Sequence, residues 1–236
     1  MGGDYAPEMV IDGAVEAAAE GGGRFQIVLV GKKDVIEKYF AEKQLSNGNI
    51  EIVDASEVIG MSESPATAVR RKRDSSIVTA MRLHKEGAVQ AVVSAGNTGA
   101  VVASSLVSLG RLRGISRPAI AISFPSKSGG TILLDGGANS DCDAHNLLQF
   151  AFMGSIYAEN LLGRVKPRVG LLSIGEEKSK GSELTRGAHE LLEGSELNFV
   201  GNVEGRDIFM GEVDVVVTDG FTGNIVLKFS ESIVQY

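Results

Sequence analysis

Short apolar runs recur along this chain, and each is followed by a glycine-containing turn and then by a longer stretch with helical spacing. The runs are rich in Val, Ile and Leu and do not alternate with polar residues, as expected for strands covered on both faces. Repeated units of this kind favour an α/β fold with a mostly parallel sheet and helices on both faces, in three layers. The predicted strands cover residues 25–31, 50–55, 88–96, 119–124, 131–138, 168–175, 197–202 and 213–220.

The predicted helices have clear starts and stops. One begins at Pro7, a favoured first-turn residue, and ends on glycines. Runs 119–124 and 131–138 have no helix between them, which predicts either a hairpin or a crossing between two sub-domains. We therefore expect one α/β catalytic domain over residues 1–236, divided, if at all, by a crossover near 118–135. The other predicted helices cover residues 32–43, 74–87, 97–110, 145–163, 182–194 and 224–236.

Both ends of the chain are predicted to be truncated. The opening "MGGD" is a turn that should follow a strand, and "NIVLKFSESIVQY" stops inside a helical pattern without a cap. We therefore expect the first strand and the C-terminal part of such a fold to be missing from this chain.

Composition limits the partners. The net charge of −7 argues against general attraction to nucleic acid. No apolar run approaches the roughly 18 to 20 residues that span a bilayer, and no signal-peptide pattern opens the chain, so a cytoplasmic location is the default expectation. The single Cys142 cannot form an internal disulfide and is expected to be a small buried thiol. The basic run "RRKR" at 70–73 predicts either a solvated helix face or a docking surface for an anionic partner.

The turns that leave the predicted strands combine glycine with Asn, Thr, Glu or Lys: "SAGNTG", "DGGANSD", "IGEEKSKG", "GNVEGRD" and "TDGFTGN". Ligands of parallel α/β sheets bind beyond the carboxyl ends of the strands, and glycine lets the backbone approach them closely. The unsatisfied N–H groups at the start of each following helix favour an anion, most simply phosphate. The alternative is that glycine serves turn geometry alone.

One of these turns is written twice, as "VVSAGNTGAVV" from Val92 and as "VVTDGFTGNIV" from Val216. We expect the two copies to place two helix N-termini, led by Thr98 and Thr222, around one anion-binding crevice.

The sequence lacks the motifs of several common enzyme classes. No "GxGxxG" follows a strand and no "GxxxxGK[ST]" occurs, which argues against simple nicotinamide and nucleotide-triphosphate chemistry. There is no "GxSxG" or "HExxH", and the histidines are far apart in sequence, so we expect no protein nucleophile of that type and no metal site. Lys180, in the glycine-flanked loop "EEKSKGSEL", would suit stabilisation of an oxyanion; otherwise it is a solvated loop lysine.

The chain resembles the PlsX family of bacterial phosphate acyltransferases, the fatty acid and phospholipid synthesis proteins. The strings that carry the resemblance occur in order along nearly the whole chain. They are "MGGDYAPE", "AVRRKRDSS", "SAGNTGA", "LGRLRGISRPA", "LLDGGAN", "FAFMGSIYAE", "RVGLLSIGEEKSKGSEL", "FVGNVEGRDI" and "VDVVVTDGFTGNIVLK".

The resemblance implies reversible transfer of a long-chain acyl group from acyl carrier protein to inorganic phosphate, which gives acyl phosphate for phospholipid synthesis. It also implies the fold of isocitrate and isopropylmalate dehydrogenases and of phosphate acetyltransferases, a homodimer, no cofactor, and loose association with the cytoplasmic membrane. Two other functions stay open: an acyl-CoA-dependent enzyme of the phosphate acetyltransferase type, and a non-catalytic scaffold that binds carrier protein.

Carried onto this sequence, the resemblance implies site residues in four of the glycine turns. Lys180 and Asn224 would be catalytic, binding phosphate or the acyl oxyanion. "AVRRKRDSS" would make Arg70, Arg71 and Arg73 a docking surface for the acidic carrier protein. The remaining phosphate- or substrate-binding residues would be Asn97, Thr98, Gly99, Asn139, Gly175, Glu176, Glu177, Asp219, Thr222 and Gly223.

This sequence departs from the family pattern in three places. Family members usually begin with a strand before "MGGD", and they continue well past Tyr236. Gly136 stands where the family commonly places Val, which predicts a looser strand end.

Overall fold

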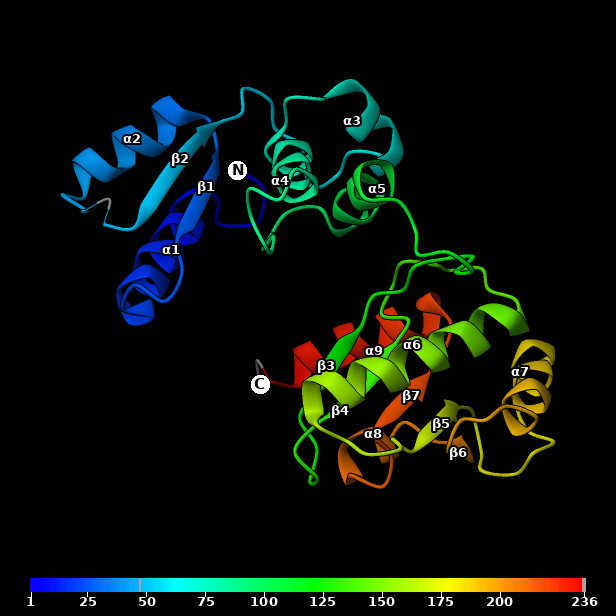
Figure 1. Cartoon of the computed structure of the whole chain (residues 1–236). Helices are drawn as coiled ribbons and strands as arrows, with labels where there is room; N and C mark the ends of the chain where they lie inside the picture. Colours follow the sequence, from blue (N-terminus) through cyan, green and yellow to red (C-terminus); the bar gives the residue numbers. More distant parts are fainter. Residues whose placement is uncertain (47, 235–236) are drawn as a thin grey trace. The chain divides into compact units, whose positions relative to one another are not determined.

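The structure is a computed structural model that describes residues 1–46 and 48–234 (Figure 1). The chain divides into two compact units, Met1–Gly110 and Arg111–Tyr236. The expectation of one catalytic domain, with any crossover near 118–135, stays a prediction.

The first unit contains a two-stranded parallel sheet of β1 (Ile27–Gly31) and β2 (Ile50–Asp54). Helices α1 (Glu8–Gly21) and α2 (Lys33–Glu42) cover it with apolar side chains. Ile11 from α1 and Phe40 from α2 pack with Leu29 in one buried cluster. The periodic apolar residues of both helices therefore form the core that the sequence predicted.

The same unit holds α3 (Pro65–Arg71), α4 (Ser76–Lys85) and α5 (Thr98–Ser108), which share a second buried cluster. Helix α3 was not predicted, although Pro65 at its first position is a recognisable start signal. The predicted strand at 88–96 is wrong, because among the described residues this segment pairs with no strand, and Val93 is 97% exposed. An apolar run forms a strand only where a neighbour supplies the hydrogen bonds.

The second unit is built on a five-stranded sheet in the order β3-β4-β7-β5-β6. Strands β4, β7, β5 and β6 are parallel, and β3 pairs antiparallel with β4, so the hairpin alternative is confirmed. The strands are short. They are β3 (Ile122–Phe124), β4 (Thr131–Leu134), β5 (Val169–Leu172), β6 (Phe199–Val203) and β7 (Val215–Val217).

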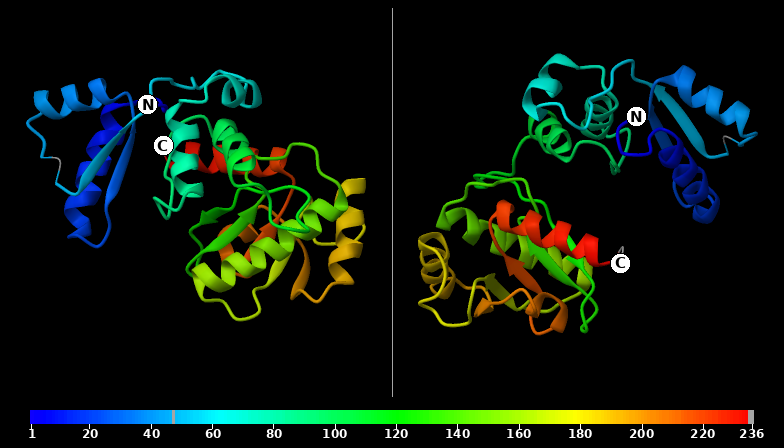
Figure 2. Two further views of the ribbon diagram at one scale, coloured as in Figure 1. Left: turned by 45° about the horizontal axis from the view of Figure 1, so that its top comes forward. Right: turned by 180° about the vertical axis from the view of Figure 1, so that it is seen from behind.

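Helices cover both faces of this sheet. On one face α6 (Ala144–Leu162) and α7 (Glu183–Glu193) pack on the strands, and on the other lie α8 (Asp207–Met210) and α9 (Gly220–Val234). Figure 2, seen from behind, shows α9 in red across the face opposite α6. Side chains of β7 alternate between the two cores, Val215 and Val217 facing α6 and Val216 facing α9. The predicted three-layer α/β fold with a mostly parallel sheet is confirmed.

Most predicted helices form within a residue or so of their predicted bounds, but α9 begins at Gly220, four residues before the predicted start at Asn224. The last two residues of that prediction, 235 and 236, lie outside the described part of the chain. Across residues 1–46 and 48–234, the helices are too short or too polar to cross a bilayer.

Candidate active site

Three neighbouring parallel strands of the second unit, β4, β7 and β5, end at the same side of the sheet, which we call the carboxyl edge. The segments that follow them are the loops 135–139 and 173–181 and, after β7, residues 218–219 with the start of α9. Adjacent parallel strands bring the segments that follow them together, so Asn139 and Lys180, in loops, and Asn224, near the start of α9, lie at one edge of the sheet. Asn97, Thr98 and Gly99 belong to the other unit.

Asp135, the residue after β4, organises the first loop. It is fully buried, and its Oδ1 accepts hydrogen bonds from the backbone N–H groups of Ile120, Gly137 and Ala138 at 2.9–3.1 Å. Its Oδ2 accepts from the N–H and the side-chain amide of Asn139 at 2.7 and 2.8 Å. Five N–H donors thus stabilise a buried carboxylate, and the carboxylate fixes the loop. Sequence analysis missed this role, because nothing in "LLDGGAN" tells a fold-organising Asp from a reactive one.

Asn139 uses its side-chain amide inside the protein. The Nδ2 group donates to the carbonyl of Pro118 at 2.7 Å as well as to Asp135. Both amide hydrogens are therefore engaged in holding the loop, and the phosphate-binding role of Asn139 stays a prediction.

The start of α9 packs against this loop through glycines. The Gly220 N–H donates to the carbonyl of Asn139 at 2.8 Å. A β-carbon added at Gly223 would lie 1.9 Å from the carbonyl oxygen of Asp135, so only glycine fits there. The side chain of Asn224 follows directly, with its Oδ1 3.4 Å from the β-carbon that a residue other than glycine would place at 137.

Asp219 caps the N-terminus of α9. Its Oδ1 accepts from the Thr222 N–H at 2.9 Å, and its Oδ2 accepts from the Thr222 hydroxyl at 2.8 Å. These bonds satisfy one of the free N–H groups of the first turn. Asp219 and Thr222 are thus bonded to each other, and their predicted contact with substrate is untested.

Gly136 is tightly enclosed rather than loosely packed. A β-carbon there would lie 2.3 Å from Cδ1 of Ile122 on β3. The expectation of a looser strand end is therefore wrong, because Ile122 fills the space that a larger residue would need.

Two of the four charged side chains in the loop after β5 form ion pairs. Glu176 pairs with Arg206 at 3.0 Å, and this hydrogen bond raises the pKa of Arg206. Lys178 pairs with Glu193 on α7. Gly175 is buried under the side chains of its own loop, so a β-carbon there would meet Glu177 Oε2 at 2.9 Å.

Lys180 and Asn224, like the Glu177 carboxylate, have no hydrogen-bond or ion-pair partner among the described residues. Among the described residues, neither the Lys180 ammonium nor the Asn224 amide takes part in a hydrogen bond or ion pair, whereas Lys178 does. Both side chains predicted to be catalytic are therefore hydrogen-bond donors that are free to bind an anion at the carboxyl edge, Lys180 from a loop and Asn224 from the start of α9.

In the first unit, Asn97 caps α5 and is buried. Its Oδ1 accepts from the Ala100 N–H at 3.0 Å, and its Nδ2 donates to the carbonyls of Gly60, Met61 and Glu63 at 3.1–3.2 Å. Its side chain is therefore saturated. By contrast, the N–H groups of Thr98 and Gly99 have no acceptor among the described residues.

In the basic run, the lysine side chain is bonded within the protein, whereas the three arginines have no carboxylate partner among the described residues. Lys72 bonds to the Val58 carbonyl and to Glu63. Arg70, Arg71 and Arg73 are exposed, and no carboxylate among the described residues pairs with them.

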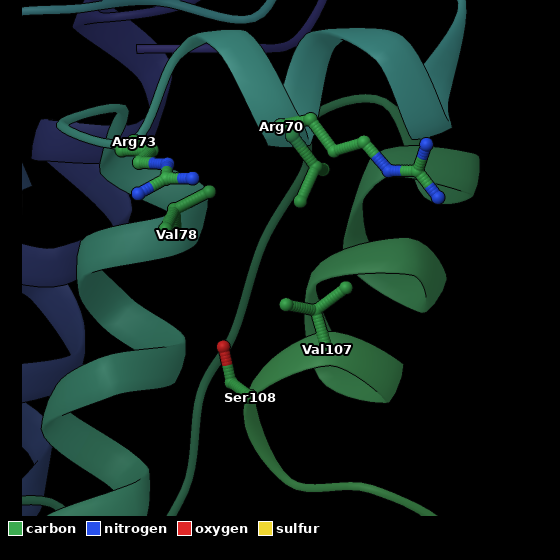
Figure 3. A pocket seen from close by; sticks show the side chains of 6 residues that line it. Arg70, Arg73, Val78, Val107 and Ser108 are labelled. Carbon is green, nitrogen blue, oxygen red and sulfur yellow. The ribbon is translucent and has the colours of Figure 1, made fainter.

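A pocket of about 300 Å³ lies beside two of these arginines (Figure 3). Its walls come from α3, α4 and the end of α5, and Figure 3 shows the Arg70 side chain extending away from Arg73, so that the two guanidinium groups border different parts of the pocket. The lining combines positive charge with an apolar floor. It consists of Val69, Arg70, Arg73, Val78, Val107 and Ser108.

The chain's cysteine and one of its histidines have structural surroundings. Burial raises the pKa of the Cys142 thiol, whose Sγ lies 3.5 Å from the Asn139 carbonyl oxygen. A raised thiol pKa lowers the thiolate fraction, so the thiol is poorly reactive, as the sequence suggested. His189 is 6% exposed and bonds to Asn202 at 2.9 Å, which makes it a core histidine.

The whole chain, residues 1–236, matches the family described as fatty acid synthesis protein. The phosphate acyltransferase of Heliobacterium modesticaldum is 57% identical over 236 residues, which cover 100% of this chain and 70% of that protein. The phosphate acyltransferase of Syntrophotalea carbinolica is 53% identical over 233 residues, which cover 99% of this chain and 67% of that protein.

Solved structures show the same fold. EutD phosphotransacetylase from Staphylococcus aureus has a TM-score of 0.65 at 18% identity and covers 97% of this chain and 80% of its own. A phosphotransacetylase from Streptococcus pyogenes has a TM-score of 0.68 at 17% identity, with 98% and 80% covered. The family prediction is confirmed: this chain belongs to the fatty acid synthesis protein family of phosphate acyltransferases and is an acyltransferase.

Proposed function

We propose that this enzyme transfers a long-chain acyl group from acyl carrier protein to inorganic phosphate, reversibly, and so forms acyl phosphate for phospholipid synthesis. Membership in the family supports transfer to phosphate. The observation that carries the proposal is a pair of hydrogen-bond donors without partners at the carboxyl edge: Lys180 in the loop after β5 and Asn224 near the start of α9.

The chemistry needs donors rather than a protein nucleophile. A phosphate oxygen attacks the thioester carbonyl carbon, the carbon–sulfur bond breaks, and the carrier's thiolate leaves and takes up a proton. Dianionic phosphate is already nucleophilic, so no general base is required. The Lys180 ammonium and the Asn224 amide would bind phosphate or the developing oxyanion, and loss of one such donor typically costs about 10² to 10³ in rate.

Backbone groups would complete the phosphate site. The N-terminus of α9 provides a positive dipole beside Asn224. In the first unit, the family resemblance supports a phosphate-binding role for Thr98 and Gly99, whose N–H groups at the start of α5 are free. The side chains of Asn97 and Asn139, which are saturated inside the protein, would act by holding these loops.

Docking of the carrier protein would use Arg70, Arg71 and Arg73. Their lack of carboxylate partners leaves three positive charges available to an acidic surface, and complementary charge accelerates association. The pocket between Arg70 and Arg73 would accept an apolar side chain of the same partner. Charge reversal at Arg70 and Arg73 should weaken carrier-protein binding more at low salt than at high salt.

The resemblance also supports a homodimer and peripheral association with the cytoplasmic membrane as parts of this proposal. Light scattering of the purified protein would measure the first, and cosedimentation with anionic vesicles the second.

The decisive experiment supplies the intact enzyme with phosphate and either acyl carrier protein thioester or acyl-CoA, and detects acyl phosphate by hydroxylamine trapping and mass spectrometry. The proposal expects product chiefly from the carrier-protein thioester. Product chiefly from acyl-CoA would favour an enzyme of the phosphate acetyltransferase type, and no product from either would favour a carrier-protein scaffold.

Variants test the site. Lys180→Ala and Asn224→Ala should each lower the rate about 10² to 10³-fold. Lys178→Ala is the matched control, because it removes an equal charge from the same loop where the lysine is already paired. Near-full activity of both Lys180→Ala and Asn224→Ala would refute the assignment.

A further inference from the structure

Two buried polar side chains that the proposed chemistry leaves unused lie behind the loop that carries Lys180. His189 is on α7 and Asn202 is on β6, and each is only 6% exposed. Figure 1 shows α7 beside β5 and β6, on which it packs. A buried polar group left without a partner costs about 1–3 kcal/mol, so the partners of these two side chains show what the side chains hold in place.

The two side chains connect the core to the loop. The Nδ1–H of His189 donates to Oδ1 of Asn202 at 2.9 Å. The Nδ2 of Asn202 donates to the backbone carbonyl of Glu177 at 2.9 Å. That carbonyl also accepts the N–H of Lys180 at 2.9 Å, which closes the turn from Glu177 to Lys180.

The orientation of the Asn202 amide follows from this arrangement. A carbonyl can only accept, so the amide nitrogen must face Glu177 and the amide oxygen must face His189. His189 then carries its proton on Nδ1, and its ring packs edge-on against Phe199 at 5.1 Å between centroids. Each contact fixes the next one, from the core to the turn.

The other side-chain contacts of the turn are at the surface, where Glu176 pairs with Arg206 and Lys178 with Glu193. Residues 176–180 are all exposed, so the Glu177 carbonyl is the point at which a buried side chain reaches the backbone of this loop. A displacement of about 1 Å at a reacting group can lower the rate about 10²-fold. The position of the Lys180 ammonium therefore depends on how firmly the turn is held.

We propose that Asn202 and His189 are positioning residues, which fix the Glu177–Lys180 turn so that the Lys180 ammonium is held where it meets the reacting groups. This inference rests on the proposed role of Lys180. It differs from a purely structural role, in which both side chains would only satisfy each other in the core.

Asn202→Asp tests the contact with little change of shape. The carboxylate can still accept from His189, but it replaces the donor that faces the Glu177 carbonyl by an acceptor. We expect kcat/KM for phosphate to fall about 10 to 10²-fold. The change should be in kcat if Lys180→Ala changes kcat, and in KM if Lys180→Ala changes KM. Asn198→Asp is the control, since Asn198 also donates to a loop carbonyl, that of Lys166, at the opposite end of β6.

A double-mutant cycle separates positioning from general destabilisation. If Asn202 acts through Lys180, the double variant Lys180→Ala/Asn202→Asp is no slower than Lys180→Ala alone. Independent, multiplying losses would overturn the inference. So would an Asn202→Asp enzyme with unchanged kinetics beside a strongly impaired Lys180→Ala enzyme, whereas an unimpaired Lys180→Ala enzyme would refute the proposed role of Lys180 itself.

His189 provides a second test if Asn202→Asp does not fold. His189→Gln keeps a donor for Asn202 and should retain most activity, while His189→Leu removes the donor and should lower kcat/KM about 10-fold. Equal activity of the two variants, at thermal midpoints that show both to be folded, would overturn the role of His189.

Discussion

The two copies of the repeated turn share their glycines and a threonine at the same spacing, yet their helices start at different places. In the first copy Asn97 caps α5, which begins at Thr98. In the second copy Asp219 caps α9, which begins at Gly220. Asp219 aligns with Ala95, two residues earlier than Asn97, so the position of the capping side chain decides where the helix starts, and the shared glycines do not.

The glycines also differ in what surrounds them. The second glycine of each copy, Gly99 or Gly223, makes a close approach, to the ring of Pro65 or to the carbonyl of Asp135. The first glycine is crowded only in the second copy, where Gly220 lies against Asn139. Both copies of the turn therefore start a helix, but only in the second copy are both glycines closely packed against neighbouring atoms.

The largest expected difference is between Gly223→Ala and Gly99→Ala. The added β-carbon would lie 1.9 Å from a backbone oxygen at 223 but 2.5 Å from a side-chain carbon at 99. A proline ring can shift more easily than the loop that Asp135 fixes. We expect a loss of about 3 kcal/mol for Gly223→Ala and about 1 kcal/mol for Gly99→Ala, measured by hydrogen exchange in each unit. Equal losses would mean that the two glycines are equivalent.

Gly220→Ala and Gly96→Ala should differ by somewhat less. A β-carbon at Gly220 would meet the carbonyl oxygen and nitrogen of Asn139 at 2.6 and 2.8 Å, whereas at Gly96 the nearest atoms, in Ile77 and Ser94, lie 3.4 Å away. We expect about 2 kcal/mol for Gly220→Ala and about 0.5 kcal/mol for Gly96→Ala. Thermal unfolding of the two variants would measure the difference, and a costly Gly96→Ala would contradict it.

Loss of the capping side chain should destabilise the first copy more than the second, which is the reverse of what we expect for the glycine substitutions. Asn97→Ala removes a cap and three bonds to the carbonyls of residues 60, 61 and 63, so we expect a loss of about 2 kcal/mol. Asp219→Ala removes a cap and one bond to a hydroxyl, and we expect about 1 kcal/mol. Asn97→Asp keeps the cap but turns a carboxylate oxygen toward three carbonyl oxygens in a buried site, so it should cost at least as much as Asn97→Ala. A larger loss for Asp219→Ala would contradict this ranking.

These contrasts show what the sequence could and could not predict. Strands β4 and β7 were predictable because continuous apolar runs such as 215–217 are buried on both faces. The segment 88–96 has the same composition but no hydrogen-bonding neighbour, and pairing cannot be read from one segment alone. The glycine-flanked loop around Lys180 could be predicted, and the catalytic role of Lys180 stays a prediction. The hydrogen bonds of Asp135 and Asn202 could not be predicted, because their partners are distant in sequence.

The smallest stability difference concerns the two threonine hydroxyls, and it bears most directly on function. The Thr222 hydroxyl donates to Asp219, while that of Thr98 is exposed and has no partner among the described residues. Thr222→Val should cost about 1 kcal/mol, and Thr98→Val about zero. If the first copy contacts phosphate as predicted, Thr98→Val should raise KM for phosphate while stability stays unchanged. The two variants would then distinguish a hydroxyl that stabilises a loop from a hydroxyl that binds a ligand. Unchanged kinetics of Thr98→Val would show that the Thr98 hydroxyl does not bind phosphate, so that the first copy would offer phosphate only its backbone N–H groups.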